Sequence, residues 1–208
     1  MLKNIDRNDS LKIIPMESRK NELIVARNLQ IKYDDKTIFS PISFDVKNGD
    51  RIAIIGKNGI GKSSILKLIV EKQLQYNGEF KVTNDLKISY VSQSTEYLKG
   101  TLKMFVQENK IDESIFKAML CKMGFSRADF DTNIEEMSEG QKKKVLLAKS
   151  ISEQANIYIW DEPLNYIDIL TRIQIEDTIL KDKPTIIFVE HDETFIEKVA
   201  TKIINIRK

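Results

Sequence analysis

The sequence predicts an α/β fold with a mostly parallel central sheet, an antiparallel β part and a short helical subdomain. From residue 51 onward, apolar segments of strand length alternate with segments of helical periodicity. This alternation is typical of a parallel sheet with helices on both faces. A glycine-rich loop at residues 56–63 separates one such strand from one such helix. Because ligands bind at the carboxyl ends of parallel strands, this loop marks the expected functional edge.

The expected elements follow from local composition and periodicity. Strands are short runs rich in Ile, Val, Phe or Tyr, and helices repeat apolar residues at intervals of three or four. We expect strands at residues 22–27, 38–46, 51–55, 79–82, 86–91, 156–160, 184–189 and 202–206. We expect helices at residues 64–71, 101–108, 112–123, 140–152, 169–180 and 192–200. Turn-forming residues lie between several of these segments, with Asn77-Gly78 expected to turn the chain before residue 79.

The sequence predicts one domain with a short preceding segment. Residues 1–20 are polar with isolated apolar positions, and we expect a loose leader or the end of an upstream linker. Residues 21–208 are expected to form the domain, into which a helical subdomain is inserted at about residues 95–150. With 208 residues, of which 41% are hydrophobic, the chain is long enough for a substantial core.

Charge and cysteine content limit the class of protein. A net charge of only +2 argues against a general basic surface for nucleic acid, although a local patch stays open. The single cysteine, Cys121, cannot form an internal disulfide, as is typical of cytosolic proteins. No apolar run approaches the ~20 residues of a membrane span, and the first residues lack the apolar segment of a secretion signal. We therefore expect a cytoplasmic protein that does not insert into a membrane.

Gly56 to Ser63 fits the phosphate-binding pattern G-x-x-x-x-G-K-[ST]. Free N–H groups and the dipole at the start of a helix attract anions, and glycines let the backbone approach phosphate oxygens. In this pattern Lys62 reaches the β- and γ-phosphates, and the Ser63 hydroxyl holds Mg²⁺. The alternative is a chance match in a glycine turn. The strand before the loop and the helix after it favour the nucleotide interpretation.

Polar residues after three other strands complete the expected site. Asp161 and Glu162 follow an apolar strand, and phosphoryl transfer needs one carboxylate near Mg²⁺ and a group that orients or deprotonates water. Alone, the pair could be a solvated strand end. His191, the only histidine, ends another strand and is expected to donate to a γ-phosphate oxygen, although a lone histidine is often structural. Gln93 is a candidate ligand of Mg²⁺ or water.

Ser138 is expected to cap the helix that begins near residue 140. Lys142, Lys143 and Lys144 lie in the first turn of that helix and oppose its dipole. An anion docked nearby would make this arrangement easier to tolerate. A solvated charged face is the equal alternative.

Together these residues resemble an ATP-binding cassette (ABC) nucleotide-binding domain, a P-loop NTPase, over residues 22–208. The resemblance implies an ATPase that uses ATP and Mg²⁺. It assigns ATP binding to Tyr33, which would stack on adenine, and to Gly56, Lys57, Asn58, Gly59, Ile60, Gly61, Lys62, Ser63, Ser64 and Asp161. It assigns Mg²⁺ to Ser63, Gln93 and Asp161, and catalysis to Glu162 as base, His191 as switch and Gln93. The signature would be Ser138, Glu139, Gly140 and Gln141, and the D-loop would end at Asp168.

The amino-acid sequence of two segments resembles one branch of this family. Met137 to Leu147 and Trp160 to Asp168 look like the second cassette of ABC-F proteins, in particular those acting against macrolides, lincosamides, streptogramins and pleuromutilins. That resemblance implies a ribosome partner and a role in antibiotic resistance. The alternative is the ATP-binding subunit of a membrane transporter, which the short helical insertion and the signature spelling disfavour. A scaffold that binds ATP without turnover is disfavoured by the presence of Glu162 and His191.

One cassette supplies only half of each ATP site in this family. The resemblance therefore implies a second cassette as partner, either another copy of the chain or a missing N-terminal half. Because ABC-F proteins carry two cassettes and a long helical linker, this chain would correspond to a C-terminal half or a truncated product. The isolated monomer is accordingly expected to bind Mg-ATP and to hydrolyse it poorly.

Overall fold

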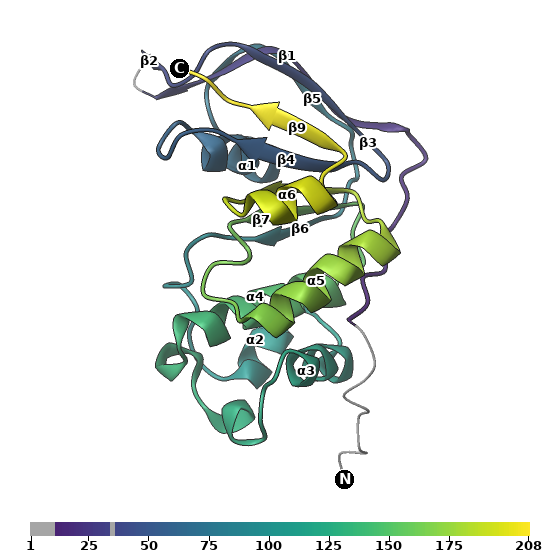
Figure 1. The fold of residues 1–208 in the computed structure, drawn as a ribbon, viewed down its shortest axis with the longest axis vertical. Helices are drawn as coiled ribbons and strands as arrows, with labels where there is room; N and C mark the ends of the chain where they lie inside the picture. The colour runs from purple at the N-terminus through teal and green to yellow at the C-terminus, as the bar shows by residue number, and fades with distance from the viewer. Residues whose placement is uncertain (1–10, 34–35) are drawn as a thin grey trace.

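A computed structural model describes residues 11–33 and 36–208. Its centre is a five-stranded sheet in the order β6-β7-β8-β4-β9, and every pair in it is parallel (Figure 1). Its strands are β4 (Arg51–Ile55), β6 (Ile88–Val91), β7 (Ile157–Asp161), β8 (Ile186–Val189) and β9 (Lys202–Asn205). The predicted parallel sheet is therefore confirmed, with strand ends within a few residues of those expected.

A second, antiparallel sheet covers the side on which α1 lies. Its longest strand pairs with three others, namely β1 (Glu22–Tyr33) with β2 (Lys36–Thr37), β3 (Ile42–Lys47) and β5 (Tyr76–Val82). The strand expected at residues 38–46 is thus shorter and starts at Ile42. The strand expected at 22–27 continues to Tyr33.

The predicted turn at Asn77-Gly78 is wrong, because both residues lie inside β5. The register between β1 and β5 shifts between Arg27 and Gln30, where Asn28 has a φ of 50°. Opposite this bulge Gly78 has a φ of 89°, and a Cβ there would lie 2.3 Å from the carbonyl oxygen of Asn28. The glycine therefore serves a close approach of two strands and not a chain reversal.

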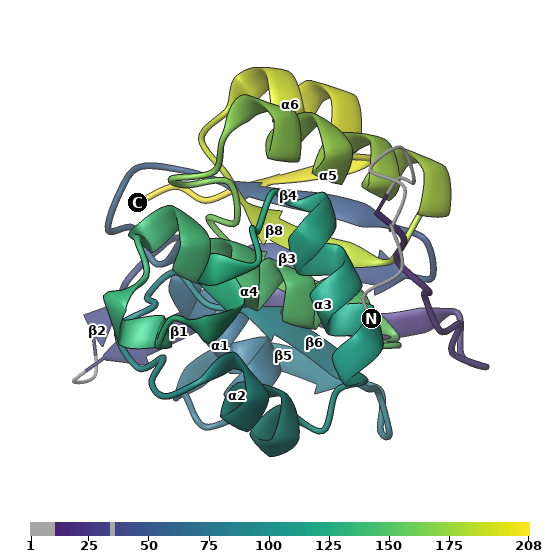
Figure 2. The same ribbon diagram turned by 90° about the horizontal axis from the view of Figure 1, so that it is seen from below.

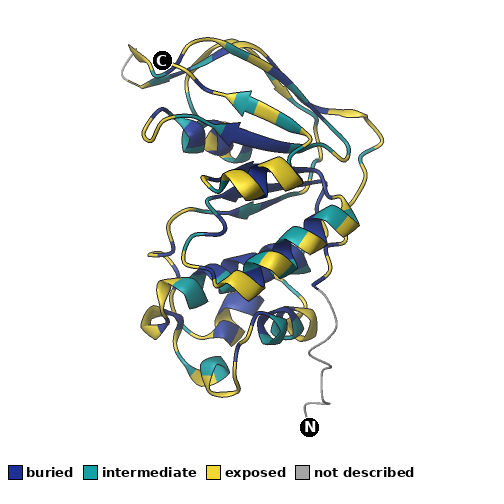
Figure 3. Cartoon of the chain, in the orientation of Figure 1, coloured by how far each residue is buried: buried dark blue, intermediate teal, exposed yellow. Residues whose placement is uncertain are grey.

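The helices lie in two layers around the parallel sheet (Figures 1 and 2). On one face, α1 (Lys62–Glu71) lies between the two sheets and shares a core with β1 and β3. On the other face, a second core holds α2 (Leu102–Asn109), α3 (Glu113–Lys122), α4 (Glu139–Ser152), α5 (Ile169–Asp182) and α6 (Glu193–Val199). Alternate residues of β8 enter opposite cores, with Ile186 and Phe188 on one face and Ile187 and Val189 on the other. The inner strands β7 and β8 are accordingly buried along their length, whereas the edge strand β9 is partly exposed (Figure 3).

Residues 11–16 are packed against the domain. Leu11 and Ile13 are buried in the helical core, and the Ile13 N–H donates to Asp182 Oδ2 at 2.7 Å. The Met16 N–H donates to the carbonyl of Ala155 at 2.8 Å. The prediction of a loose leader is therefore wrong for residues 11–16, because Leu11 and Ile13 pack into the core. Residues 1–10 lie outside the described residues, and the leader or linker assignment stays a prediction.

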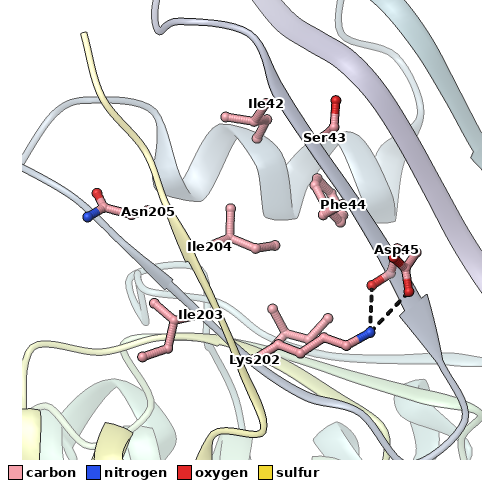
Figure 4. A pocket seen from close by; sticks show the side chains of 9 residues that line it. Ile42, Ser43, Phe44, Asp45, Lys202, Ile203, Ile204 and Asn205 are labelled. Atoms are coloured by element: carbon pink, nitrogen blue, oxygen red, sulfur yellow. Dashed lines mark hydrogen bonds and ion pairs between the residues drawn. The ribbon is translucent and has the colours of Figure 1, made fainter.

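Lys202 joins the two sheets by ion pairs. Its Nζ, at the start of β9, lies 3.0 Å from Asp45 Oδ2 on β3 and 2.8 Å from Asp50 Oδ2. Figure 4 shows the groove between β3 and β9, which Lys202 and Asp45 close at one end and which Ile42, Phe44 and Ile204 line. The hydrogen bond from Lys202 lowers the pKa of Asp45. This cation is shared by two carboxylates, so removing it leaves Asp45 with only the longer ion pair to Lys47, at 3.9 Å, and Asp50 with the Lys47 N–H.

Replacing Lys202 by Met is expected to lower the free energy of unfolding by about 1 kcal/mol, because Asp45 and Asp50 lose their shared cation. Urea denaturation of the purified domain measures this change. Lys81→Met is the matched control, since the Lys81–Glu79 pair is far more exposed and should leave the midpoint unchanged. Equal shifts in the two variants would contradict a special role for Lys202.

Candidate functional site

The glycine loop joins β4 to α1 at the carboxyl edge of the parallel sheet. Gly56, Gly59 and Gly61 have φ values of 153°, 73° and 109°, which other residues rarely adopt. A Cβ on Gly56 would lie 2.8 Å from the carbonyl oxygen of Ile206. Gly61 occupies the N-cap of α1 without a side-chain cap, so the first N–H groups of this helix keep their capacity for an anion.

Lys62 is buried at the start of α1 and its ammonium points back along the loop. Its Nζ donates to the carbonyls of Gly56 at 2.9 Å and Lys57 at 3.3 Å, and lies 3.5 Å from Asn58 Oδ1. The positive charge is thus placed beside the free N–H groups of the helix. Tyr33, at the end of β1, lies near the same loop, because its hydroxyl is 3.2 Å from Ser64 Oγ.

Asp161 and Ser63 form a donor set that fits Mg²⁺. Burial raises the pKa of Asp161, whose side chain is 1% exposed, and a hydrogen bond from Ser63 opposes that rise. The Oδ1 atom of Asp161 is buried and has no hydrogen-bond partner, which leaves a free lone pair beside a hydroxyl. No group of three or more His, Cys, Asp and Glu side chains arranged to hold a metal ion occurs in the described ranges. Proteins hold Mg²⁺ with one or two carboxylates while phosphates and water supply the rest, and Asp161 beside Ser63 fits that pattern.

Three side chains converge on the Glu162 carboxylate. Gln93 Nε2 donates to its Oε2 at 2.9 Å, and His191 Nε2 lies 3.5 Å from its Oε1. These residues follow β6, β7 and β8, which are neighbours in the sheet, so the structure brings together the predicted catalytic residues. Asn165 Nδ2 also donates to Glu162 Oε2, at 2.6 Å. Sequence reasoning did not assign Asn165, and its only signal was its place three residues after Glu162.

Glu190 is a second residue that sequence reasoning missed. It is buried between the Glu162 turn and His191, and burial raises its pKa. Its Oε1 accepts the N–H of Leu164 at 2.8 Å, and its Oε2 accepts the N–H of His191 at 3.1 Å. One carboxylate therefore fixes the backbone on both sides of the site.

The predicted signature residues lie at the start of α4, apart from the glycine loop. Ser138 caps this helix as expected, and with Gln141 it forms a capping box in which each side-chain oxygen accepts the backbone N–H of the other residue. Gly140 allows a close approach, because a Cβ there would lie 2.6 Å from the carbonyl oxygen of Tyr166. Glu139 accepts a hydrogen bond from Thr95. Among the described residues, no hydrogen bond or ion pair joins 138–141 to 56–64 of the same chain.

The three lysines near the start of α4 all have partners within the chain. Lys142 pairs with Glu139 at 3.1 Å, and Lys144 pairs with Asp168 at 2.6 Å. Lys143 is buried and donates to backbone carbonyls. Neither a docked anion nor a solvated face is therefore needed to explain them, and the sequence could not reveal the partners of Lys143 and Lys144, which are distant along the chain.

Asp168, the predicted end of the D-loop, caps α5 and pairs with α4. It accepts from the N–H of Thr171 at 3.0 Å in addition to its ion pair with Lys144. Burial raises the pKa of Asp168, but the hydrogen bonds from Lys144 and Thr171 outweigh it and lower this pKa to about 2. The D-loop is thus tied to the helix that carries residues 138–141.

Comparisons with known proteins agree with this geometry. Residues 39–165 match the family model described as ABC transporter. ABC transporter F family member 2 of Arabidopsis thaliana is 30% identical over 191 residues, which cover 89% of this chain and 28% of that protein. The ribosome protection protein VmlR of Bacillus subtilis is 30% identical over 180 residues, which cover 84% of this chain and 32% of that protein. The chain thus spans about a third of the length of these curated relatives.

A solved structure, titled as the ATP binding subunit of an ABC transporter, has the same fold, with a TM-score of 0.72 at 20% sequence identity. The match covers 89% of this chain and 86% of that one. In the part of the chain that the structure describes, no helix is both long and apolar enough to cross a bilayer.

Replacing Asp168 by Asn is expected to destabilise the domain in a pH-dependent way. The pKa of Asp168 falls from 3.8 to about 2 on folding, so its stabilising effect is full above about pH 4 and is lost as pH falls toward 2. Asn still caps a helix, so the variant isolates the ion pair. Urea denaturation at several pH values measures the difference from the unmodified domain, which should vanish near pH 2.

Lys144→Met provides the control for this ion pair. At pH 6 the two substitutions are expected to be non-additive, because each removes the same interaction. Additive effects at pH 6, or a difference that persists at pH 2, would show that Asp168 acts through capping alone.

Proposed function

The chain belongs to the ABC transporter family, and on this premise we propose that it binds Mg-ATP at residues 56–64 and hydrolyses it with Glu162 as the base. Domains of this family are ATPases that use ATP with Mg²⁺ and pair with a second cassette. The convergence of Gln93, Asn165 and His191 on Glu162, beside the glycine loop, is the observation that carries the proposal.

Each residue has a role that follows from its position. The Lys62 ammonium and the first N–H groups of α1 bind the phosphates, and Tyr33 stacks on adenine. Ser63 and Asp161, with Gln93, hold Mg²⁺, which when bound neutralises phosphate charge. The Glu162 carboxylate takes a proton from the attacking water, because the amides of Gln93 and Asn165 fix its Oε2 and leave Oε1 facing His191. His191 donates from its imidazole to a γ-phosphate oxygen.

The proposed hydrolysis is completed by a second cassette. Among the described residues, 138–141 form no hydrogen bond or ion pair with the loop of their own chain, which fits a role at the ATP of a partner. Beside them, Tyr166, Ile169 and Leu170 are each 74% exposed, an unusual amount of apolar surface on a soluble domain. We propose that this surface and residues 138–141 meet the glycine loop of another cassette, either a second copy or an N-terminal half.

We further propose that the domain serves an ABC-F protein that acts on ribosomes in antibiotic resistance. The sequence of residues 137–147 and 160–168 supports membership of the ABC-F branch. The similarity to VmlR, whose name describes ribosome protection, supports it as well. The alternative, an ATP-binding subunit of a membrane transporter, is supported by the fold shared with such a subunit. In either case we expect the domain to act in the cytoplasm, as the sequence predicts.

Replacing Glu162 by Gln is expected to slow ATP hydrolysis by at least ten-fold and to leave ATP affinity unchanged, because the amide cannot accept the proton. Lys62→Ala is the contrasting variant and is expected to weaken ATP binding, since it removes the loop ammonium. Calorimetric binding and phosphate release measure the two effects. Unchanged hydrolysis in Glu162→Gln would remove that residue as the base.

Turnover per chain is expected to rise with protein concentration, because a second copy supplies residues 138–141 to each site. Phosphate release measured across a range of concentrations, with the oligomeric state followed by light scattering, tests this expectation. A specific activity that is constant in a demonstrably monomeric sample would rule out the paired site.

The ribosome partnership predicts that Glu162→Gln, held with ATP, sediments with ribosomes more than the same variant without ATP. Lys62→Ala serves as the control that lacks bound nucleotide. Equal sedimentation of both variants with and without ATP would count against the ABC-F proposal and in favour of the transporter alternative.

A further inference from the structure

Lys143 is a charged residue in the core next to the site, and the proposed mechanism does not use it. Its side chain is 1% exposed. Its Nζ donates to the carbonyl oxygens of Ser92 at 2.9 Å and Gln93 at 3.2 Å, and lies 3.5 Å from that of Asp161. An ammonium has three donors, and these three carbonyls match them. A buried ammonium without partners would be strongly unfavourable, so these contacts are the condition for its burial.

The partners of Lys143 belong to separate parts of the fold. Ser92 and Gln93 follow β6, and Asp161 ends β7, whereas Lys143 lies on α4. Lys143 lies two residues after Gln141, so the same helix end carries residues 138–141. The Gln93 backbone that Lys143 holds bears the amide that reaches Glu162.

Carboxylates around Lys143 favour its charged form, but burial has the larger effect on its pKa. Burial lowers the pKa of Lys143, while the carboxylates of Asp161, Glu162 and Glu190 oppose that shift. Two of these carboxylates are themselves buried, namely Asp161 and Glu190. A methionine or leucine of similar size would fill the same volume but would leave the three carbonyls without a donor. Simple core filling therefore does not account for a lysine here.

We propose that Lys143 is a positioning residue that holds the backbone at Ser92 and Gln93, so that the Gln93 amide reaches Glu162, and that ties this contact to the start of α4. A displacement of residues 138–141 along with α4 is thereby transmitted to the Glu162 carboxylate. The link to catalysis rests on the proposed role of Glu162, whereas the attachment of Gln93 to α4 does not.

Hydrogen–deuterium exchange of the unliganded domain tests whether Lys143 holds the backbone at Ser92 and Gln93, and it needs no nucleotide. In Lys143→Met, exchange in residues 88–97 is expected to quicken about ten-fold, because charged hydrogen bonds that hold this segment are lost. Exchange in α1 is expected to stay unchanged. Lys144→Met is the matched control, because Lys144 is the next residue on the same helix and its Nζ binds Asp168 and the Met123 carbonyl, each at 2.6 Å and both outside residues 88–97. It should leave residues 88–97 as they are.

Two exchange results would overturn the proposal: no change in residues 88–97, or an equal change throughout the chain, which indicates general destabilisation. Should Lys143→Met fail to fold, Lys143→Gln is measured against the same criteria, since its shorter amide loses the charge and cannot reach all three carbonyls.

Steady-state kinetics then test the link to Glu162. Lys143→Met is expected to lower kcat about ten-fold and to leave KM and ATP affinity unchanged, since the glycine loop is not altered. In Gln93→Ala the same lysine substitution should have little further effect. An unchanged kcat in a variant whose residues 88–97 exchange faster would overturn the catalytic link. An unmodified domain that binds but never hydrolyses ATP would count against the proposed function, and the exchange result would still decide the attachment.

Discussion

The parallel pairing of β6, β7 and β8 is the constraint on which the site depends. Val91 pairs with Trp160, and Asp161 pairs with Val189, so the residues that follow these strands emerge side by side. Both faces of these strands are buried, and a register shift of one residue would move each apolar side chain to the wrong core. The apolar packing of the sheet thereby fixes the register of its strands. The register in turn fixes the positions at which Gln93, Glu162 and His191 approach one another.

Burial of charge is the cost of this arrangement, and the fold offsets it locally. Asp161 and Glu190 are almost fully buried carboxylates, and Lys143 is a buried ammonium within the same region. Glu190 is satisfied by two backbone N–H groups and Lys143 by backbone carbonyls. The Oδ1 atom of Asp161 alone lacks a partner among the buried carboxylate atoms described, which is the property expected of a ligand for Mg²⁺.

The two segments proposed to contact ATP, the glycine loop and residues 138–141, are built on different cores. The glycine loop and α1 rest on the core shared with the antiparallel sheet, whereas α4 and residues 138–141 rest on the helical core. The parallel sheet separates these cores, and the contacts of Lys143 join α4 to the backbone after β6 and at the end of β7. An anion-binding loop on one core and an exposed helix start on the other suit a protein that works as a pair.

The sequence by itself determined the alternation of strands and helices, the glycine loop and the helix caps, because these depend on periodicity and on interactions within a few residues. Ser138 caps the helix that its sequence position predicts, and Asp112 and Asp168 cap their helices by the same local interaction. Only the tertiary structure decided the contacts between residues far apart: the packing of Leu11 and Ile13, the bulge at Gly78, the Asn165 and Glu190 contacts, and the partners of Lys143. A lysine on a helix looks solvated in sequence, and its burial depends on carbonyls that the folding of two distant strands brings to it.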